Sequence, residues 1–563
     1  MKTIESIVER RDEIIEEIRN LRSMRKGIIN EQYLKVPHKG KEAFLRGPYY
    51  VLTKKQNGKT VSTRIRRNEY EEIKKETEAY KKFNLLSSEF ATITEELTYM
   101  RKISQTENSK KKQEIHKEEF GAEIEKFLEV ARGNIRHGKI PAMEDIEEGM
   151  REAAHRDGSR ALSMLLSEIP DVYEEGVICD TCGREMENLG RREKGIISLL
   201  GEGTVSRMYY ECIGSECKEH RFPKDELLDI AGTSFSPGVR RLMGKSGSDD
   251  AFDKGRLDLK EYSGIEVGAK DVERISESIG NDIEKWQKDE RTKILAQAIP
   301  VRPDKNIPVL YVECDGTGVP VIPEELEGRK GKQEDGSAKT RESKVGCIFT
   351  QTTADEKGHP IRDKNSTTYV GAIETSAEFG ERLEAEAIRR GLWNAETVVI
   401  LGDGAIWVRN LVEQHFCGVI QIVDFYHAKE HLHKLLQLLF DTQEKFKEQE
   451  PIWIKWFEDG NIEEIVKTAK QLHPDPKEIC KNIEKETGYF EENVDRMRYA
   501  DYKKKGLFVG SGVIEAGCKT VIGKRLKQSG MRWSVRGADA IIALRCCILS
   551  GRFDEYWENR AAV

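Results

Sequence analysis

Two apolar runs that each end in an Asp-Gly pair constrain this chain more than any other feature. Residues 307–314 lead into Asp315, and residues 397–402 lead into Asp403. Runs of this kind are typical of β-strands. Asp-Gly is also a common turn former, so either acid taken alone could serve only to end its strand.

A third acid, Glu515, is isolated among basic residues. It is the only acid from Tyr502 to Arg536, a stretch that contains nine lysines and arginines. Carboxylates are the hard oxygen ligands that Mg²⁺ prefers, and two such ions can clamp the attacking and leaving oxygens of an in-line displacement. Two carboxylates at strand ends and a third among cations therefore indicate a divalent-metal site that acts on phosphodiesters.

The order of the predicted elements is that of an RNase H-like α/β core. Strands are expected at 307–314, 344–352, 366–372, 396–402 and 418–423, with a helix at 375–391. Three strands, a helix, a strand, a helix and a further strand follow one another in such a core. Residues 301–426 are then its first part, 427–505 a helical insertion, and 506–563 the C-terminal core helices that carry Glu515.

Two cysteine pairs form a separate module. Cys179 and Cys182 are separated by two residues, and Cys212 and Cys217 follow after 29 intervening residues. Each pair can form a tight knuckle, and the two knuckles together offer a tetrahedral four-thiolate site for one structural Zn²⁺. His220 is close enough to replace a ligand, but four thiolates already close the coordination shell, which argues against catalysis there. The alternative is a set of four reduced structural cysteines.

The module is predicted to be a zinc ribbon over residues 175–224. Outside it, the first half of the chain is predicted to be mainly helical. Residues 1–120 are expected to form a helical arm of unknown role that begins with a charged amphipathic helix over 1–34. A β-hairpin at 47–66 interrupts the arm. Residues 121–174 follow as a helical linker region.

Residues 225–300 are predicted to be a helical region that could bind DNA. Part of it resembles the turn and second helix of a helix-turn-helix, with Gly264 or Gly268 in the turn. Its inward-facing residues would be Ile265, Val272, Ile275 and Ile279. The pattern is degenerate, and an ordinary helical connector is the alternative.

Length and composition bound the class of protein. A chain of 563 residues is expected to hold several domains, which gives a multidomain α+β protein here. Its formal charge of −7 is not that of a polycation, but residues 1–102 carry 23 basic and 16 acidic residues. Neither a signal peptide nor an apolar run of about 18 residues is present, so no membrane partner and a cytoplasmic location are expected.

The motifs together resemble bacterial DDE-type insertion-sequence transposases, close to the ISKra group. The resemblance spans roughly residues 175–550 and is carried by residues 179–182 with 212–217, 315–317, 402–407, 423–428, 510–515 and 530–533. It implies an RNase H-like core whose catalytic residues are Asp315, Asp403 and Glu515. These three would bind two Mg²⁺ or Mn²⁺ ions.

The resemblance also implies that Asp424 and His427 form the Asp-x-x-His motif shared with Mutator-like transposases. These two residues are expected to support the active site by hydrogen bonding, or only to pack. His427 and His431 are one helical turn apart, so a zinc-binding pair is a further alternative. The implied partners are double-stranded DNA, as transposon ends and target, and further copies of the chain in a homo-oligomer.

The basic residues that follow Glu515 are the candidates for DNA binding. Cations can contact phosphates, and an aromatic side chain among them can support a stacked or flipped base. The candidates are Lys519, Lys524, Arg525, Lys527, Arg532 and Trp533. Two alternatives to a transposase stay open: a two-metal nuclease of the same fold that does not join strands, and a transposase-derived DNA-binding regulator.

Overall fold

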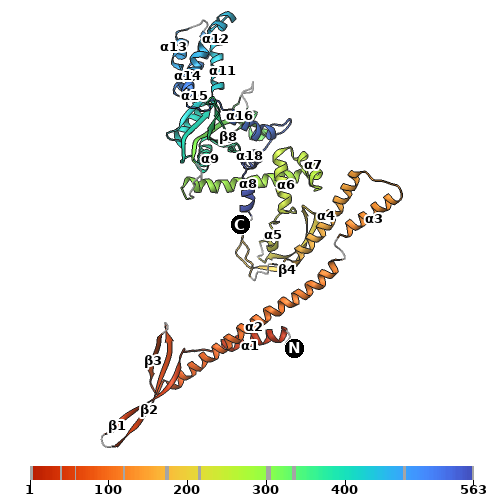
Figure 1. Cartoon of the computed structure of the whole chain (residues 1–563), viewed down its shortest axis with the longest axis vertical. Helices are drawn as coiled ribbons and strands as arrows, with labels where there is room; N and C mark the ends of the chain where they lie inside the picture. The colour runs from red at the N-terminus through yellow and green to blue at the C-terminus, as the bar shows by residue number, and fades with distance from the viewer. Residues whose placement is uncertain are drawn as a thin grey trace. The chain divides into compact units, whose positions relative to one another are not determined.

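The computed structural model describes residues 4–38, 41–56, 59–117, 121–171, 176–213, 217–298, 306–331, 338–472 and 477–560. The chain forms two compact units, Met1–Ala122 and Glu123–Val563. Both contain helices and sheets, so the protein is a mixed α/β multidomain protein (Figure 1). Among the helices of these residues, none is both long enough and apolar enough to cross a bilayer.

The first unit combines two packed helices with a three-stranded antiparallel sheet in the order β1-β2-β3. Its elements are α1 (Ile4–Arg19), β1 (Ile28–His38), β2 (Lys41–Gln56), β3 (Lys59–Ile65) and α2 (Tyr70–Lys117). Ile7 and Ile14 of α1 are buried with Leu86 and Ile93 of α2. The hairpin predicted at 47–66 is present, since β2 pairs with β3.

The first helix is shorter than the predicted 1–34. It ends at Arg19, and the chain forms strand β1 from Ile28. Ile29 packs with Leu52 and Ile65 of the sheet and with Ile73 of α2. These contacts join residues far apart in the sequence, so a local helical pattern could not reveal them.

The second unit begins with two helices and the cysteine module. Its first elements are α3 (Ala122–Arg136), α4 (Met143–Glu168), β4 (Met186–Ser198), β5 (Gly201–Cys212), β6 (His220–Arg221) and α5 (Pro223–Leu227). Strands β4, β5 and β6 form an antiparallel sheet in that order. The Asp157 carboxylate of α4 accepts hydrogen bonds from the backbone N–H groups of Glu123 and Ile124, which fixes the start of α3.

Three helices connect this module to the core: α6 (Pro237–Asp249), α7 (Phe252–Ser263) and α8 (Ala269–Leu295). Gly264 ends α7 in the left-handed conformation, with φ of 68°, as a helix C-terminus often requires. The four residues predicted to face inward, Ile265, Val272, Ile275 and Ile279, are all buried.

The core is a five-stranded sheet in the order β11-β8-β7-β12-β13. Its strands are β7 (Ile307–Pro320), β8 (Thr340–Gln351), β11 (Thr368–Ala372), β12 (Ala395–Gly402) and β13 (Ile420–Val423), and each matches one of the predicted runs. β7, β8 and β11 pair antiparallel, whereas β12 pairs parallel with both β7 and β13. The short strands β9 (Thr353–Ala354) and β10 (Pro360–Ile361) form a separate ribbon.

Helices cover both faces of this sheet. Because side chains alternate along a strand, Leu310 and Val312 face one side and Tyr311 and Glu313 the other. The first pair packs on helices α9 (Ser376–Arg389) and α10 (Ile406–His415). Helices α16 (Gly512–Cys518) and α18 (Val535–Leu549) contact the sheet from the C-terminal segment, and Tyr311 shares a core with residues of both helices.

The predicted insertion is helical. It contains α11 (Phe425–Leu439), α12 (Gln443–Glu458), α13 (Ile462–Gln471), α14 (Lys477–Asn493) and α15 (Tyr499–Lys504), of which α11 to α14 pack on one another (Figure 1). Trp453, Phe457 and Phe490 are fully buried between them. The chain then continues through α16, a π-helical turn at Lys519–Gly523, α17 (Lys524–Leu526) and α18, and ends with α19 (Phe553–Arg560).

Helices α8 and α18 cross at the closest distance that a glycine allows. A Cβ atom added at Gly280 would lie 2.0 Å from the carbonyl oxygen of Ala540. Backbone atoms cannot move aside as a flexible side chain can, so residue 280 has to be glycine for this crossing.

Replacing Gly280 with alanine is expected to destabilise the protein by about 1–3 kcal/mol or more, the usual cost of overpacking a core. Gly133→Ala is the matched control, because no atom lies within 4 Å of a Cβ added at that helical position. The control should be neutral or stabilising by up to about 1 kcal/mol. Thermal unfolding of both variants tests this, and equal melting temperatures would contradict the close crossing.

Candidate active site

Three aspartates lie at one level, where the parallel pairing of β7, β12 and β13 ends. Leu401 of β12 pairs with Glu313 of β7, so Asp403 is level with Asp315, two residues further along each strand. Gly402 pairs with Val423 at the end of β13, and the backbone N–H of Asp424 donates to the Gly402 carbonyl at 2.8 Å. The parallel register thus places all three acids beside the carboxyl ends of β12 and β13, where ligands bind in open α/β sheets. Asp315 does not end its strand as predicted, because β7 continues to Pro320 in antiparallel pairing with β8.

Asp315 and Asp403 are close enough to influence each other. Both are half-buried. Burial raises the pKa of Asp315, and the neighbouring charge of Asp403 raises it further. Oδ1 of Asp315 accepts from the backbone N–H of Gly316 and Oδ1 of Asp403 from that of Ala405, at 2.7 and 2.9 Å. Two acids that repel each other at a partly buried edge are suited to sharing a cation.

Glu515 lies on the adjoining helix and faces solvent. Its side chain is 66% exposed, and Oε1 forms an ion pair with Lys519 Nζ at 2.6 Å. Cys518, one turn further along α16, lies with Sγ 3.8 Å from Oδ2 of Asp315. Residues three apart are neighbours on a helix surface, so Glu515 lies beside the aspartate edge. Its carboxylate does not close on the two aspartates within metal-ligand distance.

Glu313 is a buried acid at this edge to which the sequence analysis assigned no role. It shares a sheet face with Asp315, and Oε2 accepts from the backbone N–H of Ile514 at 2.8 Å. This bond fixes the residue directly before Glu515. Burial raises the pKa of Glu313 to about 8, so the side chain is largely protonated near neutral pH. The sequence contains one sign of this buried acid: Glu313 is a charged residue inside an otherwise apolar strand, and charged residues are rarely buried without a partner.

Asp424 supports the site through backbone hydrogen bonds. Its Oδ1 accepts from the backbone N–H of His427 at 2.6 Å and caps α11, while Oδ2 accepts from the N–H of Ser511 at the start of α16. The carboxylate thereby joins the end of β13 to two helices. The expected support of an active site by Asp424 stays a prediction.

The structure does not favour a zinc pair of His427 and His431. Nδ1 of His431 lies 2.6 Å from Oε2 of Glu486, and its ring stacks on Tyr489. The half-buried ring of His427 makes an edge contact with the ring of His431. A charge on His427 would lower the pKa of Asp315, which indicates that His427 lies near the aspartates. Tyr489 donates its hydroxyl hydrogen to the carbonyl oxygen of Asp403 at 3.1 Å and so ties the insertion to the site.

Two of the six predicted DNA-binding residues are in the interior, which corrects the prediction for them. Arg525 is fully buried, stacks on Phe252 and Trp533, and donates from Nε to the Gly247 carbonyl. Burial lowers its pKa to about 10. Trp533 is 6% exposed and donates from Nε1 to the Leu526 carbonyl. A cation beside an aromatic ring stabilises the core here and does not form a DNA-binding surface.

The other four candidates, Lys519, Lys524, Lys527 and Arg532, are exposed. Lys527 Nζ lies 2.6 Å from the hydroxyl of Thr317, two residues beyond Asp315. Lys519 is paired with Glu515 as described above. The exposed cations thus include two that lie directly beside the acidic edge, where phosphate groups would need neutralising.

The four cysteines of the module converge on one point. Their sulfur atoms all lie within 4.8 Å of one another, with Cys179 to Cys217 at 3.7 Å and Cys182 to Cys212 at 3.3 Å. A tetrahedral site with metal–sulfur bonds of about 2.3 Å has sulfur atoms about 3.8 Å apart. Hydrogen bonds from backbone N–H groups, of Cys182 above all, lower the pKa of Cys179 to about 7, which favours a thiolate.

Among the described residues this is the one group of three or more His, Cys, Asp or Glu side chains at metal-ligand distances. His220 stays outside it and packs against Tyr209 and Phe222. The residues present therefore fit a structural metal ion held by sulfur alone.

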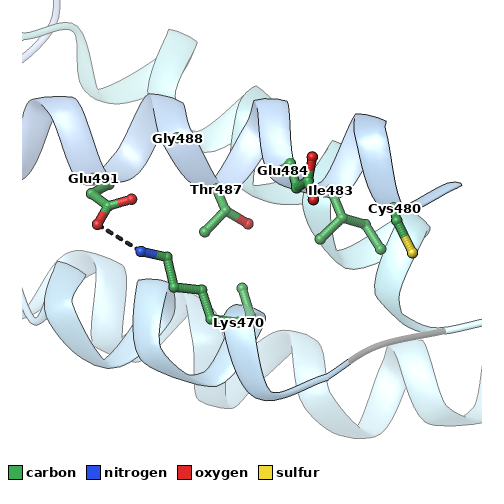
Figure 2. A pocket seen from close by; sticks show the side chains of 8 residues that line it. Lys470, Cys480, Ile483, Glu484, Thr487, Gly488 and Glu491 are labelled. Carbon is green, nitrogen blue, oxygen red and sulfur yellow. Dashed lines mark hydrogen bonds and ion pairs between the residues drawn. The ribbon is translucent and has the colours of Figure 1, made fainter. Parts of the chain in front are cut away.

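A cavity elsewhere in the second unit does not coincide with the acidic edge. It lies between α13 and α14, and Figure 2 shows Lys470 and Glu491 joined by an ion pair of 2.6 Å at one end of it. Its lining also includes Ile483 and Thr487, and no predicted site residue contributes to it.

These features define an α/β protein with an acidic sheet edge and a four-cysteine module. The chain belongs to the uncharacterised protein family UPF0236, whose family model matches residues 139–559. A curated relative, the UPF0236 protein in the vanSb 3′ region of Streptococcus gallolyticus, is 21% identical over 388 residues, which cover 67% of this chain and 77% of the relative. A solved Drosophila P element transposase strand transfer complex matches 57% of this chain and 80% of its own, with 8% identity and a TM-score of 0.19.

Replacing Glu313 with glutamine is expected to remove a pH dependence of stability. Between the pKa of an unfolded glutamate, about 4.3, and the folded value of about 8, the folded state binds one more proton than the unfolded state. The wild-type free energy of unfolding therefore falls as pH rises through this window. Without added divalent cations, the melting temperature should fall more between pH 5 and pH 8 in the wild type than in Glu313→Gln.

Glu413→Gln serves as the control, because Glu413 is an exposed acid paired with Arg409 on α10. It should follow the wild-type pH profile. A Glu313→Gln profile parallel to wild type would show that Glu313 is ionised in the folded protein throughout this range.

Proposed function

We propose that this chain is a DNA transposase with an RNase H-like core, which nicks transposon ends and transfers the free 3′-OH into target DNA by two-metal-ion catalysis. The observation that carries the proposal is the level placement of Asp315 and Asp403 on adjacent parallel strands, where the charge of Asp403 raises the pKa of Asp315. The strand order and directions, with three antiparallel strands followed by two parallel ones, support an RNase H-like core.

In this proposal Asp315, Asp403 and Glu515 hold the two Mg²⁺ or Mn²⁺ ions. When bound, such ions activate a water or a 3′-hydroxyl and stabilise the leaving 3′-oxygen. Asp315 and Asp403 each accept a backbone N–H hydrogen bond through Oδ1. Within the described part of the chain, the second carboxylate oxygen of each accepts no backbone hydrogen bond, and carboxylate oxygens are the ligands that suit hard cations. Glu515 reaches the site once Lys519 releases it.

The residues around the acids position them and the DNA. Glu313 and Asp424 fix the backbone at Ile514 and Ser511, and so hold the start of the helix that carries Glu515. Exposed Lys519 and Lys527 lie next to the acids and supply positive charge for the phosphate backbone. The partner is double-stranded DNA, bound by a homo-oligomer because two ends have to be joined.

The direct test is metal-dependent cleavage and joining of labelled duplex DNA that carries the sequences flanking the coding region. Asp315→Asn, Asp403→Asn and Glu515→Gln should each lower both activities about 100-fold or more, the scale of losing one electrostatic stabiliser of a transition state. Glu413→Gln is matched to Glu515→Gln, since both acids are exposed and form an ion pair with a cation four residues away. It should retain wild-type activity.

Each contrary outcome identifies a different protein. Cleavage without joined product would make the chain a nuclease of the same fold. Binding of these duplexes without any cleavage, in Mg²⁺ or in Mn²⁺, would make it a DNA-binding regulator. Full activity in all three acid variants would exclude the proposed site.

We also propose that the cysteine module binds one structural Zn²⁺. Purified protein should contain about one zinc per chain, and Cys182→Ser should lose it, because three thiolates leave the tetrahedral site open. Cys417→Ser, at an exposed cysteine outside the module, should keep the full zinc content. Elemental analysis of the three proteins measures this, and zinc retained in Cys182→Ser would argue against the four-thiolate site.

A further inference from the structure

The strand region of the first unit is strongly basic. Residues 28–67 contain ten lysines and arginines but only two acidic residues. Outside the strands of this unit, several cations are paired with acids: Arg10 with Glu89, Arg25 with Glu76, and Lys82 with Glu17. The excess positive charge is therefore concentrated on the sheet.

The two faces of this sheet differ in character. One face packs against α2 through Leu52, Ile65 and Ile73. The other face, which we call the open face, carries polar and basic side chains from all three strands together with the apolar Ile28 and Val51. Its members include Asn30 of β1, Tyr49, Thr53 and Lys55 of β2, and Ser62 and Arg64 of β3, all of them exposed or half-buried.

Contacts across the strands hold the open face in one arrangement. The Asn30 amide donates to the Thr53 hydroxyl at 3.4 Å, and the Thr53 and Ser62 hydroxyls are 3.3 Å apart. The Arg64 guanidinium lies 4.1 Å from the centre of the Tyr49 ring. Stacking fixes the plane of the guanidinium and leaves its N–H groups directed outward, which suits bidentate hydrogen bonding to a phosphate or a base edge.

The cations of this region have no acidic partner within the described part of the unit. No ion pair is formed there by Lys55 and Arg64 of the open face, by Lys54 and Lys59 on the opposite face of the strands, or by Arg66 and Arg67 just beyond β3. Unpaired cations on an ordered sheet repel one another, and the negative charge of a bound polyanion offsets that repulsion. Binding is also favoured because the polyanion releases its own counterions. The charge and the polar side chains together fit a nucleic acid.

We propose that the open face binds duplex DNA, with its cations on the phosphates and its polar side chains at the groove. Three strands about 4.8 Å apart span about 10 Å, and the major groove is about 12 Å wide. Sheets are known to enter DNA grooves in this way. The choice of duplex DNA among nucleic acids rests on the proposed function, whereas the charge argument for a polyanion does not.

The test uses the full chain and a fluorescently labelled 30-base-pair duplex. Lys55→Glu combined with Arg64→Glu should weaken binding at least tenfold and reduce the slope of log affinity against log salt concentration by about two, one for each lost phosphate contact. Lys81→Glu is the control, an exposed lysine on α2 in the same unit, and should change both quantities much less. Equal losses in the control and the double variant would overturn the proposal.

Further experiments distinguish loss of the proposed site from misfolding of the variants and from a preference for another nucleic acid. Arg64→Lys keeps the charge but not the stacked guanidinium, so it should keep the wild-type salt slope and lose only part of the affinity lost on charge reversal. Circular dichroism melting should match wild type for all variants. Wild-type binding by the double variant would overturn the proposal, as would tighter binding of double-stranded RNA than of the DNA duplex. Binding is measured without divalent cations, where the proposed cleavage cannot occur, so a failure of catalysis and a failure of this surface give different results.

Discussion

The parallel pairing of β7 with β12 is the constraint on which the rest of the candidate site depends. Its register sets Asp315 and Asp403 at the same level, and the pairing of β12 with β13 extends that level to Asp424. A shift of one residue would turn every side chain of a strand to the other face. The buried residues on both faces, such as Leu310 and Tyr311, therefore fix the acids without contacting them.

A second level of organisation comes from two carboxyl groups that face backbone N–H groups and not solvent. Glu313 holds Ile514, and Asp424 holds Ser511, so two strands of the sheet determine where α16 starts. Buried acids are unfavourable unless they are hydrogen-bonded or protonated. Glu313 and Asp424 therefore link the stability of the sheet edge to the position of Glu515. Neither has a proposed metal contact, but each would influence the proposed site by holding the start of α16.

Much of the core could be predicted from the sequence because its signals are local. The five strands appeared as apolar runs, and the helix predicted at 375–391 is α9, whose start is set by a local capping box of Thr375 and Glu378. The errors concern nonlocal packing. The motif at Arg525 and Trp533 looked like a surface for DNA, but Phe252 and the Gly247 carbonyl, nearly 300 residues earlier in the sequence, enclose it. Strand β1 was missed for the same reason, since its partners come from β2.

The ion pair between Glu515 and Lys519 bears on how three acids could act together when only two are adjacent. An exposed pair four residues apart on a helix contributes only about 0.3–0.5 kcal/mol, because water and salt screen it. Exchanging that pair for a divalent cation on one side and a phosphate on the other costs little, because the phosphate replaces one negative charge by another and the divalent cation replaces a single positive charge by two. The observed conformation of Glu515 is therefore compatible with a site that is completed when metal and DNA bind, with Lys519 moving to the phosphate.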